Sequence, residues 1–175
     1  MDIADTILAK SDQINAADLA RPITVTVEGV DVVGGDQPVN IYLVGYPGKA
    51  YRPSLGMRRV LVKIWGPRSA DYAGRRMTLF NEPSVTWGGK AVGGIRISHA
   101  SHITAPVMVP IPTARGKITP HTVEPLPTAP PIPAFTSIDQ ARAYYAERQH
   151  AGADPAELAA IQAAAPAPAP APQEN

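Results

Sequence analysis

The chain has 175 residues, no cysteine, and 20 prolines that crowd toward its C-terminal half. That length suits one domain of ordinary size plus extra segments, and the lack of cysteine excludes disulfides and thiolate metal sites. No apolar run approaches the roughly 18 residues of a membrane span, and the N-terminus MDIADTILAK has acids where a secretory signal has basic residues. We therefore expect a cytoplasmic protein without membrane contact.

The formal net charge of +1 conceals a segregation of charge along the chain. Between residues 49 and 102 there are ten Lys or Arg but two acids, so this segment carries +8 and the remaining residues carry −7. A basic centre with acidic flanks indicates a polyanionic partner for the centre. The alternative is an ordinary solvated sheet face.

Composition divides the chain into five segments. They are a lead-in at 1–20, a β domain at 21–124, a proline-rich linker at 125–136, a short helical segment at 137–164 and an Ala-Pro tail at 165–175. In the lead-in, Asn15 and Asp18 have the spacing of a weak capping box, and Leu19 can anchor the segment before the first strand.

The β domain opens with two strands, 22–35 and 38–45, in which β-branched and apolar residues alternate with polar ones. Loop 46–57 follows, and it contains the cations Lys49 and Arg52 on either side of Tyr51. A mobile loop of this kind suits contacts to a nucleic-acid backbone and base; the alternative is a turn with its ring against the domain.

Three further segments, 58–66, 74–80 and 93–99, share one rule of alternation. Aliphatic residues occupy every second position, and the opposite face carries cations and aromatic rings. If the three segments pair as strands of one sheet, that face collects Arg59, Lys63, Trp65, Arg76, Phe80 and Arg96.

Glycine pairs mark two corners of the domain. Gly88-Gly89, between Trp87 and Lys90, predicts a tight hairpin. The pair at 93–94 indicates a bulge, a sharp bend or the close approach of another backbone. Neither pair leads into a helix with a following GK[ST], so a phosphate-binding loop is not indicated.

The last apolar strand, Val107 to Ile111, is interrupted by prolines, which confine it to a sheet edge. His99 and His102 precede it without a suitable third ligand, so we expect hydrogen-bonding histidines or a minor phosphate contact and no metal. Residues 114–126 either add a final strand or wrap around the domain.

Two helices are predicted after the linker. Ser137 can cap the first, which Gly152 ends, and Asp154 followed by Pro155 starts the second. Both are short and weakly apolar, so they are expected to pack on the β domain or to bind a partner. The Ala-Pro tail predicts a polyproline-II spacer.

The sequence contains none of the motifs of an enzyme. There is no GxSxG, cysteine nucleophile, HExxH or nucleotide-binding fingerprint, and the acids of the β domain are scattered. Ser98 and His99 are neighbours on an extended strand and point to opposite faces. We therefore expect a non-catalytic protein without cofactors.

Alternating strands with glycine corners predict a mainly β fold, a small antiparallel OB-like barrel of five or six strands. The strings RRVLVKIWG and GRRMTLFNEPSVTWGGKAVGGIRISHAS resemble a family of small phage and prophage proteins found among replication and recombination genes, usually without an assigned function. The resemblance covers residues 10–126. It implies a phage origin in a host cytoplasm and, more loosely, an OB-like role in binding single-stranded DNA.

The leading hypothesis is a phage protein that binds single-stranded DNA in replication or recombination, with RNA as an open alternative. Cations would neutralise phosphates and rings would stack bases. The predicted binding residues are Lys49, Tyr51, Arg52, Arg59, Lys63, Trp65, Arg76, Phe80, Trp87, Lys90 and Arg96.

Two other classes use the same surface. The basic face could be a protein interface of a phage structural or assembly protein, covered by the flanks or by a second copy. It could also bind a host enzyme as an inhibitor. The C-terminal segment could in either case dock a phage or host protein.

Overall fold

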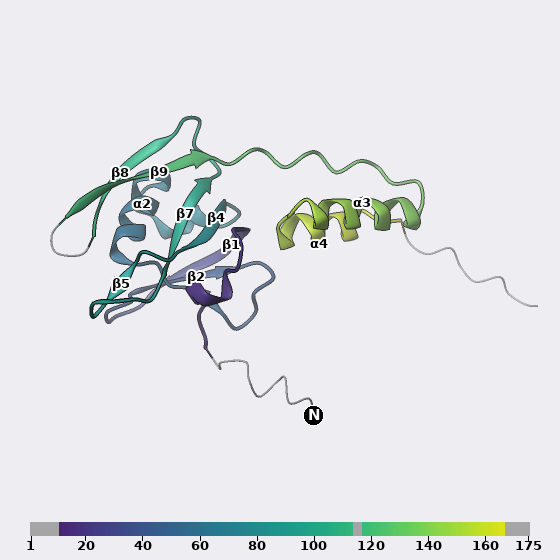
Figure 1. Cartoon of the computed structure of the whole chain (residues 1–175). Coiled ribbons are helices and arrows are strands. Elements are labelled where there is room, and N and C mark those ends of the chain that lie inside the picture. The colour runs from purple at the N-terminus through teal and green to yellow at the C-terminus, as the bar shows by residue number, and fades with distance from the viewer. Residues whose placement is uncertain (1–10, 114–116, 167–175) are drawn as a thin grey trace, which may run out of the picture. The chain divides into compact units, whose positions relative to one another are not determined.

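The computed structural model describes residues 11–113 and 117–166, which belong to two compact units, Met1–Pro127 and Thr128–Asn175 (Figure 1). The first unit contains η1 (Ala16–Asp18), β1 (Ile23–Val32), β2 (Val39–Leu43), β3 (Ala50–Tyr51), α2 (Leu55–Trp65), η2 (Ser69–Tyr72), β4 (Arg76–Glu82), β5 (Thr86–Trp87), β6 (Lys90–Ala91), β7 (Gly94–Ala100), β8 (Val107–Pro112) and β9 (Ile118–Pro125). The second contains α3 (Ile138–His150) and α4 (Pro155–Ala163).

Seven strands form one sheet in the order β3-β2-β1-β4-β7-β9-β8. All neighbours are antiparallel except β7 and β9, whose parallel pairing joins His99 to Glu124 and Ala100 to Pro125. The two outer strands, β3 and β8, do not pair with each other, so the sheet is open. The prediction of a mainly β protein is confirmed, whereas the sheet is not closed into a barrel.

Strand β1 bends between two sets of partners. Its first half pairs with β4, and its second half pairs with β2 after an irregularity between Val27 and Gly29. Alternation places Val25 and Val27 in the core beside Met77 and Leu79 of β4. The predictions of strands at 22–35, 38–45, 74–80 and 93–99 are therefore confirmed, with somewhat different bounds.

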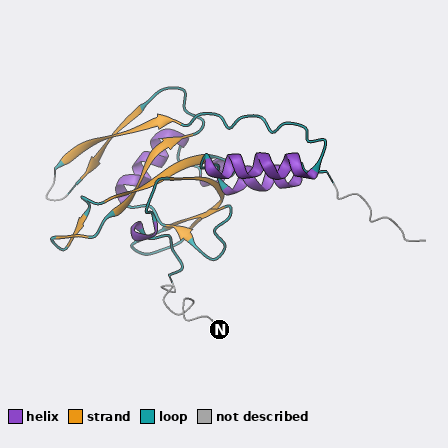
Figure 2. Ribbon diagram, turned by 45° about the vertical axis from the view of Figure 1, so that its right-hand side comes forward, coloured by secondary structure: helices purple, strands orange, loops and turns teal. Residues whose placement is uncertain are grey.

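The prediction of a strand over 58–66 is wrong, because these residues form most of helix α2 (Figure 2). Its buried residues, Met57, Val60, Leu61, Ile64 and Trp65, recur with helical spacing. The Ser54 side chain caps the helix by accepting a hydrogen bond from the Met57 amide. Gly66, with φ of 89°, ends it.

Helix α2 covers one face of the sheet. Its buried side chains belong to the same hydrophobic core as Val25, Leu79 and Ile97 of three different strands. It also packs along the edge strand β8, where Val109 and Ile111 are buried. Because side chains alternate along a strand, the neighbours of these core residues lie on the opposite face of the sheet.

The lead-in has the expected local structure. The Asn15 amide donates to the Asp18 carboxylate across 3.0 Å, as in a capping box, and Leu19 is buried in the core. Backbone hydrogen bonds of 3.0 Å join Ile14 and Asp12 to Ala50 of β3. The lead-in therefore continues the sheet beyond its shortest strand.

The corner glycines serve two purposes. Gly88 and Gly89 have φ of 58° and 81° and form the predicted tight reversal between β5 and β6. A Cβ added to Gly94 would lie 2.9 Å from the Val85 side chain, so glycine there permits close packing at the base of this hairpin. The close neighbour at Gly94 is thus a side chain and not the predicted second backbone, whereas φ of 73° at Gly93 agrees with the predicted bend.

Edge strand β8 has few free donors. The Thr113 amide donates to the Lys117 carbonyl across 2.7 Å. Because alternate residues of an antiparallel strand face its partner, this bond shows that the odd-numbered residues of β8 direct their backbone groups toward β9. In this register Pro110 lies opposite Pro120, and neither can donate. Even-numbered residues of β8 therefore direct their backbone polar groups away from β9, toward the free edge of the sheet.

The second unit is a helical hairpin. Ser137 and Asp154 cap its two helices by accepting hydrogen bonds from Gln140 and Glu157, as predicted. The helices pack on each other through Ala141 and Ile161. An ion pair of 2.6 Å between Arg148 and Glu157 also joins them, and the Phe135 ring lies 5.7 Å from that of Tyr144.

Candidate nucleic-acid interface

The basic, aromatic face predicted from the sequence is divided between two places. Arg76 and Phe80 share one face of β4, and Arg96 of β7 lies directly opposite Phe80 in the ladder. That part of the prediction is confirmed. Arg59 and Lys63 instead lie on the exposed side of α2, a helix that packs on the other face of the sheet.

Trp65 is part of the core and does not offer its face to a base. The side chain is 5% exposed, and its Nε1 donates a 2.8 Å hydrogen bond to the Ser101 carbonyl. The Tyr72 ring packs edge-on at 5.2 Å, and the Arg75 guanidinium lies 5.8 Å from the indole centre. The prediction of a stacking role was wrong because it assumed a strand where the chain forms a helix.

Tyr51 is buried as well. It is 1% exposed within β3, its hydroxyl has no hydrogen-bond partner, and burial raises the pKa of that hydroxyl. The alternative considered for this residue, a ring packed against the domain, is correct. A base-stacking role for Tyr51 is excluded because its ring is not accessible.

Arg52 holds the lead-in to the sheet. Its guanidinium pairs with Asp12 at 2.6 Å and donates from Nε to Asn40 at 2.8 Å. The pKa of Asp12 is lowered by the hydrogen bond and the charge of Arg52. This arginine already has a carboxylate partner, so it is a poor candidate for a phosphate contact.

The remaining predicted residues lie apart from these. Lys49 is half-buried in the loop before β3, and Lys90 is exposed on β6. The Trp87 side chain lies outside the described residues.

A shallow groove between α2 and β8 is the candidate interface. Its volume is about 660 Å³, and it is lined by Arg58, Arg59, Val62, Lys63, Val109 and Pro110. In the parts of the chain that the structure describes, none of these three cations has a carboxylate within ion-pair distance. The Nε of Arg58 is buried without a hydrogen-bond partner. Three uncompensated cations therefore lie on the α2 side of a groove whose other lining residues, Val62, Val109 and Pro110, are apolar.

The composition of α2 explains this arrangement. The helix contains no acid, and its apolar stripe faces the core, so its cations are left at the sides and on the outer face. Leu55 and Val62, seven residues apart, are 52% and 50% exposed on that outer side. The sequence reasoning missed Arg58, Val62, Val109 and Pro110; helical rather than strand periodicity would have indicated the first two.

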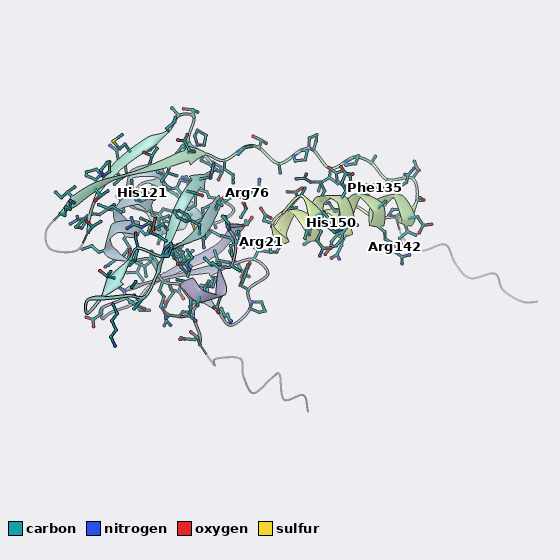
Figure 3. The ribbon with its side chains drawn as sticks, in the orientation of Figure 1. Arg21, Arg76, His121, Phe135, Arg142 and His150 are labelled. Atoms are coloured by element: carbon teal, nitrogen blue, oxygen red, sulfur yellow. The ribbon has the colours of Figure 1, made fainter. Side chains whose placement is uncertain are left out.

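The opposite sheet face has mixed charge. Glu82 ends β4 and accepts hydrogen bonds from Ser84, which lower the pKa of its carboxyl, with smaller contributions from Arg96 and His121. His121 on β9 (Figure 3) donates from Nε2 to the Ile97 carbonyl across 2.7 Å. Because acid and base are interspersed here, this face is less suited to a polyanion than the groove.

Within 11–113 and 117–166, no cluster of three His, Asp or Glu has the geometry to hold a metal ion. His99 and His102 contact the hydroxyls of Ser98 and Ser101 at 3.0 and 2.8 Å. The expectation that Ser98 and His99 point to opposite faces is therefore wrong, because a register shift in the β4–β7 ladder leaves Ser98 as an extra residue there. No helix in these ranges is sufficiently long and apolar to cross a membrane.

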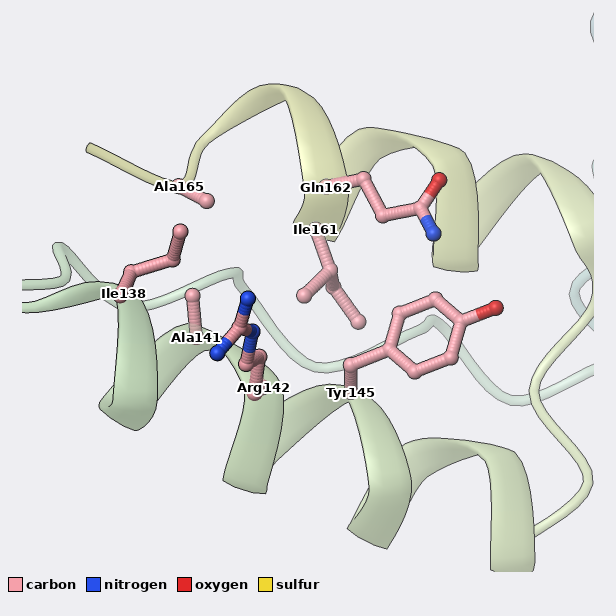
Figure 4. Close-up of a pocket in the computed structure, with 7 residues that line it drawn as sticks. All are labelled: Ile138, Ala141, Arg142, Tyr145, Ile161, Gln162 and Ala165. Atoms are coloured by element: carbon pink, nitrogen blue, oxygen red, sulfur yellow. The ribbon is translucent and has the colours of Figure 1, made fainter. Parts of the chain in front are cut away.

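The helical hairpin has a pocket of its own, of about 340 Å³ (Figure 4). It is lined by Ile138, Ala141, Arg142, Tyr145, Ile161, Gln162 and Ala165. The lining is mainly apolar, and its one charged residue, Arg142, has the nearby Asp139 as a counter-ion at 3.7 Å. This pocket lacks the cation density of the α2–β8 groove.

Comparison with protein-family models, curated proteins and solved structures finds no match to this chain.

Proposed function

We propose that this protein binds single-stranded nucleic acid without catalysis, through the groove between α2 and β8. The observation that supports it is the set of three unpaired cations, Arg58, Arg59 and Lys63, around one apolar groove. Phosphates attract such cations, and unstacked bases gain by covering apolar surface. Bases in a duplex are already stacked, so an apolar floor favours single strands.

A role in phage DNA replication or recombination is part of this proposal, and the resemblance of the quoted segments to phage proteins motivates it. We also propose that the β domain is related to OB-like folds, although its sheet is open. Phe80 and Arg96 on the other sheet face are retained as a secondary contact for a longer strand.

Fluorescence anisotropy with end-labelled 12-nucleotide single strands and the matching duplex tests the proposal. Three neutralised phosphates predict that log affinity falls with log salt at a slope of about −2. The double variant Arg59→Glu, Lys63→Glu should weaken binding at least tenfold and flatten the slope. Tryptophan emission is not the measurement of choice, because Trp65 is buried.

Arg68→Glu is the matched control. Arg68 is exposed, belongs to the same basic segment, and pairs with Asp71 at 3.0 Å away from the groove lining. The Arg68→Glu substitution should leave the affinity for single strands within about twofold of the original value, once the effect of the lower overall charge is subtracted. Equal losses in both variants, or no binding by the unmodified protein at low salt, would contradict the proposed function.

A protein interface is the second candidate, favoured by the exposure of Leu55 and Val62 beside the same cations. An apolar stripe on a basic helix also suits an acidic protein partner, such as one in phage assembly. If the groove variants leave nucleic-acid binding unchanged but alter the state of association measured by light scattering, this reading replaces the first.

A further inference from the structure

We propose that the groove prefers cytosine and adenine, whose amino groups lie at N4 and N6, over thymine and uracil, which have a carbonyl oxygen at O4. The inference rests on the proposed function and adds base preference to it. It comes from the backbone of β8, which forms one wall of the groove. At its free edge this backbone presents more hydrogen-bond acceptors than donors.

The groove reaches the free edge of β8. Val109 and Pro110 both line it, yet successive residues of a strand direct their side chains to opposite faces. Val109 is buried toward α2, whereas Pro110 is exposed. A groove that touches both must border the strand along the side that β9 does not occupy.

That edge offers acceptors and few donors. The hydrogen bond from Thr113 to Lys117 sets the parity of the ladder, so Met108, Pro110 and Pro112 direct their backbone groups outward. Each of the three has a carbonyl oxygen, but the two prolines lack an N–H group. Three acceptors thus accompany a single donor, the Met108 amide. Of the three residues, Pro110 lines the groove itself, and Met108 and Pro112 continue the edge on either side of it.

An acceptor-rich wall discriminates between bases. The amino group at N4 of cytosine or N6 of adenine can donate to a strand carbonyl. Thymine and uracil present the O4 carbonyl at the corresponding position, and two carbonyl oxygens repel each other. Their one donor on this edge, the N3–H group, lies between the O4 and O2 carbonyls, so it approaches a strand carbonyl less favourably than an amino group does. In a duplex, base pairing engages one hydrogen of each amino group, whereas an unpaired base can turn its whole edge to the strand, which agrees with a preference for single strands.

The cations and the edge would act on different parts of one strand. Arg58, Arg59 and Lys63 on α2 would hold the phosphates, and the β8 wall across the groove would contact the base edges. Phosphate contacts carry no sequence information, whereas the base contacts do. Salt dependence and base preference should therefore be separable.

The test compares labelled 12-nucleotide oligo-dC, oligo-dT and oligo-dU with the full-length protein by anisotropy. Cytosine and thymine are of similar size, and oligo-dU controls for the thymine methyl group. We expect oligo-dC to bind about tenfold more tightly than either, the equivalent of one net hydrogen bond. All three should show the same salt slope.

Pro110→Ala restores an N–H donor at the edge while keeping a small apolar side chain. It should strengthen oligo-dT binding and reduce the preference for oligo-dC to about threefold or less. Pro120→Ala is the control, because Pro120 lies opposite on β9 and directs its backbone away from β8; it should retain the preference.

The possible failures are distinct. Equal affinity of the unmodified protein for oligo-dC and oligo-dT, with salt-dependent binding to both, overturns the base preference but leaves the proposed function intact. Absence of binding to every oligonucleotide at low salt overturns both. An undiminished preference in Pro110→Ala would show that the β8 edge is not its source.

Discussion

The indole Nε1 of Trp65 donates a hydrogen bond to the carbonyl oxygen of Ser101, 2.8 Å away. Trp65 is the last residue of α2, and Ser101 follows the last residue of β7. Ser101 also exchanges hydrogen bonds of 2.8 Å with the backbone of Arg76, through its amide and its hydroxyl. One serine thus joins the helix to the centre of the sheet.

Trp65→Phe should destabilise the fold by about 1–3 kcal/mol, because it leaves the Ser101 carbonyl without the indole donor and shortens a buried ring. Urea denaturation followed by circular dichroism measures this loss. Nucleic-acid affinity at low urea should remain within about twofold of the original value. A large loss of nucleic-acid affinity in a folded Trp65→Phe protein would indicate that Trp65 contributes to binding after all.

Gly94→Ala should destabilise the protein by about 1–3 kcal/mol, since its Cβ would meet the Val85 side chain at 2.9 Å. Gly34→Ala is the control, because no atom lies within 4 Å of the Cβ it would add. Thermal unfolding of the two variants side by side makes the comparison. Similar melting temperatures would mean that the 85–94 contact adjusts without cost.

Ser54→Ala should remove the cap of α2 and cost about 1 kcal/mol, because the Met57 amide would lose its side-chain acceptor. Ser54→Asp, which retains an acceptor, should restore most of that stability. Hydrogen exchange of the first-turn amides provides a local measurement. Unaltered exchange in Ser54→Ala would contradict the capping role.

Protonation of His121 should lower stability in mildly acidic solution. Burial lowers the pKa of this imidazole below its ordinary value of 6.5, although its hydrogen bond to Ile97 acts in the opposite direction. The unfolded chain therefore binds a proton more readily than the folded one. Stability should fall as pH decreases through 6.5 and level off below the folded-state pKa.

Urea midpoints measured between pH 4.5 and 8 test the role of His121, with His121→Gln as the comparison. Glutamine retains a donor for the Ile97 carbonyl but does not titrate, so its midpoint should vary less over this range. Asp12 and Glu82, whose pKa values are lowered, lose their contributions at more acidic pH. If the urea midpoints of the unmodified protein and of His121→Gln vary identically with pH, His121 is excluded as the cause of the pH dependence of stability.

The strands were predictable where one face of the sheet is buried in the core and the other is more exposed, because apolar and polar residues then alternate along the strand. β4 shows this best: Met77 and Leu79 are fully buried, and the intervening and following positions lie on the other face. The caps at Ser137 and Asp154 were also predictable, since capping depends on local chemistry alone. Register, in contrast, depends on pairings between distant segments and could not be obtained from local patterns.

Helix α2 shows why the candidate site was misplaced. The run Val60-Leu61-Val62 is rich in the β-branched residues of a strand, and the alternate residues Val60, Val62 and Ile64 are all apolar. Tertiary packing overrode this preference, because Met57, Leu61 and Trp65 complete a helical stripe that the core buries. The groove itself combines α2 with β8, over forty residues later, a pairing that no local pattern contains.

Both margins of the sheet are closed to further strands. At β3, Gln13 bridges Ala50, and at β8 the prolines at 110 and 112 withhold the donors that an incoming strand would need. Addition of another chain as an eighth strand, the common route to fibrils, is therefore opposed at either end. Concentrated solutions should resist fibre growth, and self-association would have to use side chains instead of main-chain ladders.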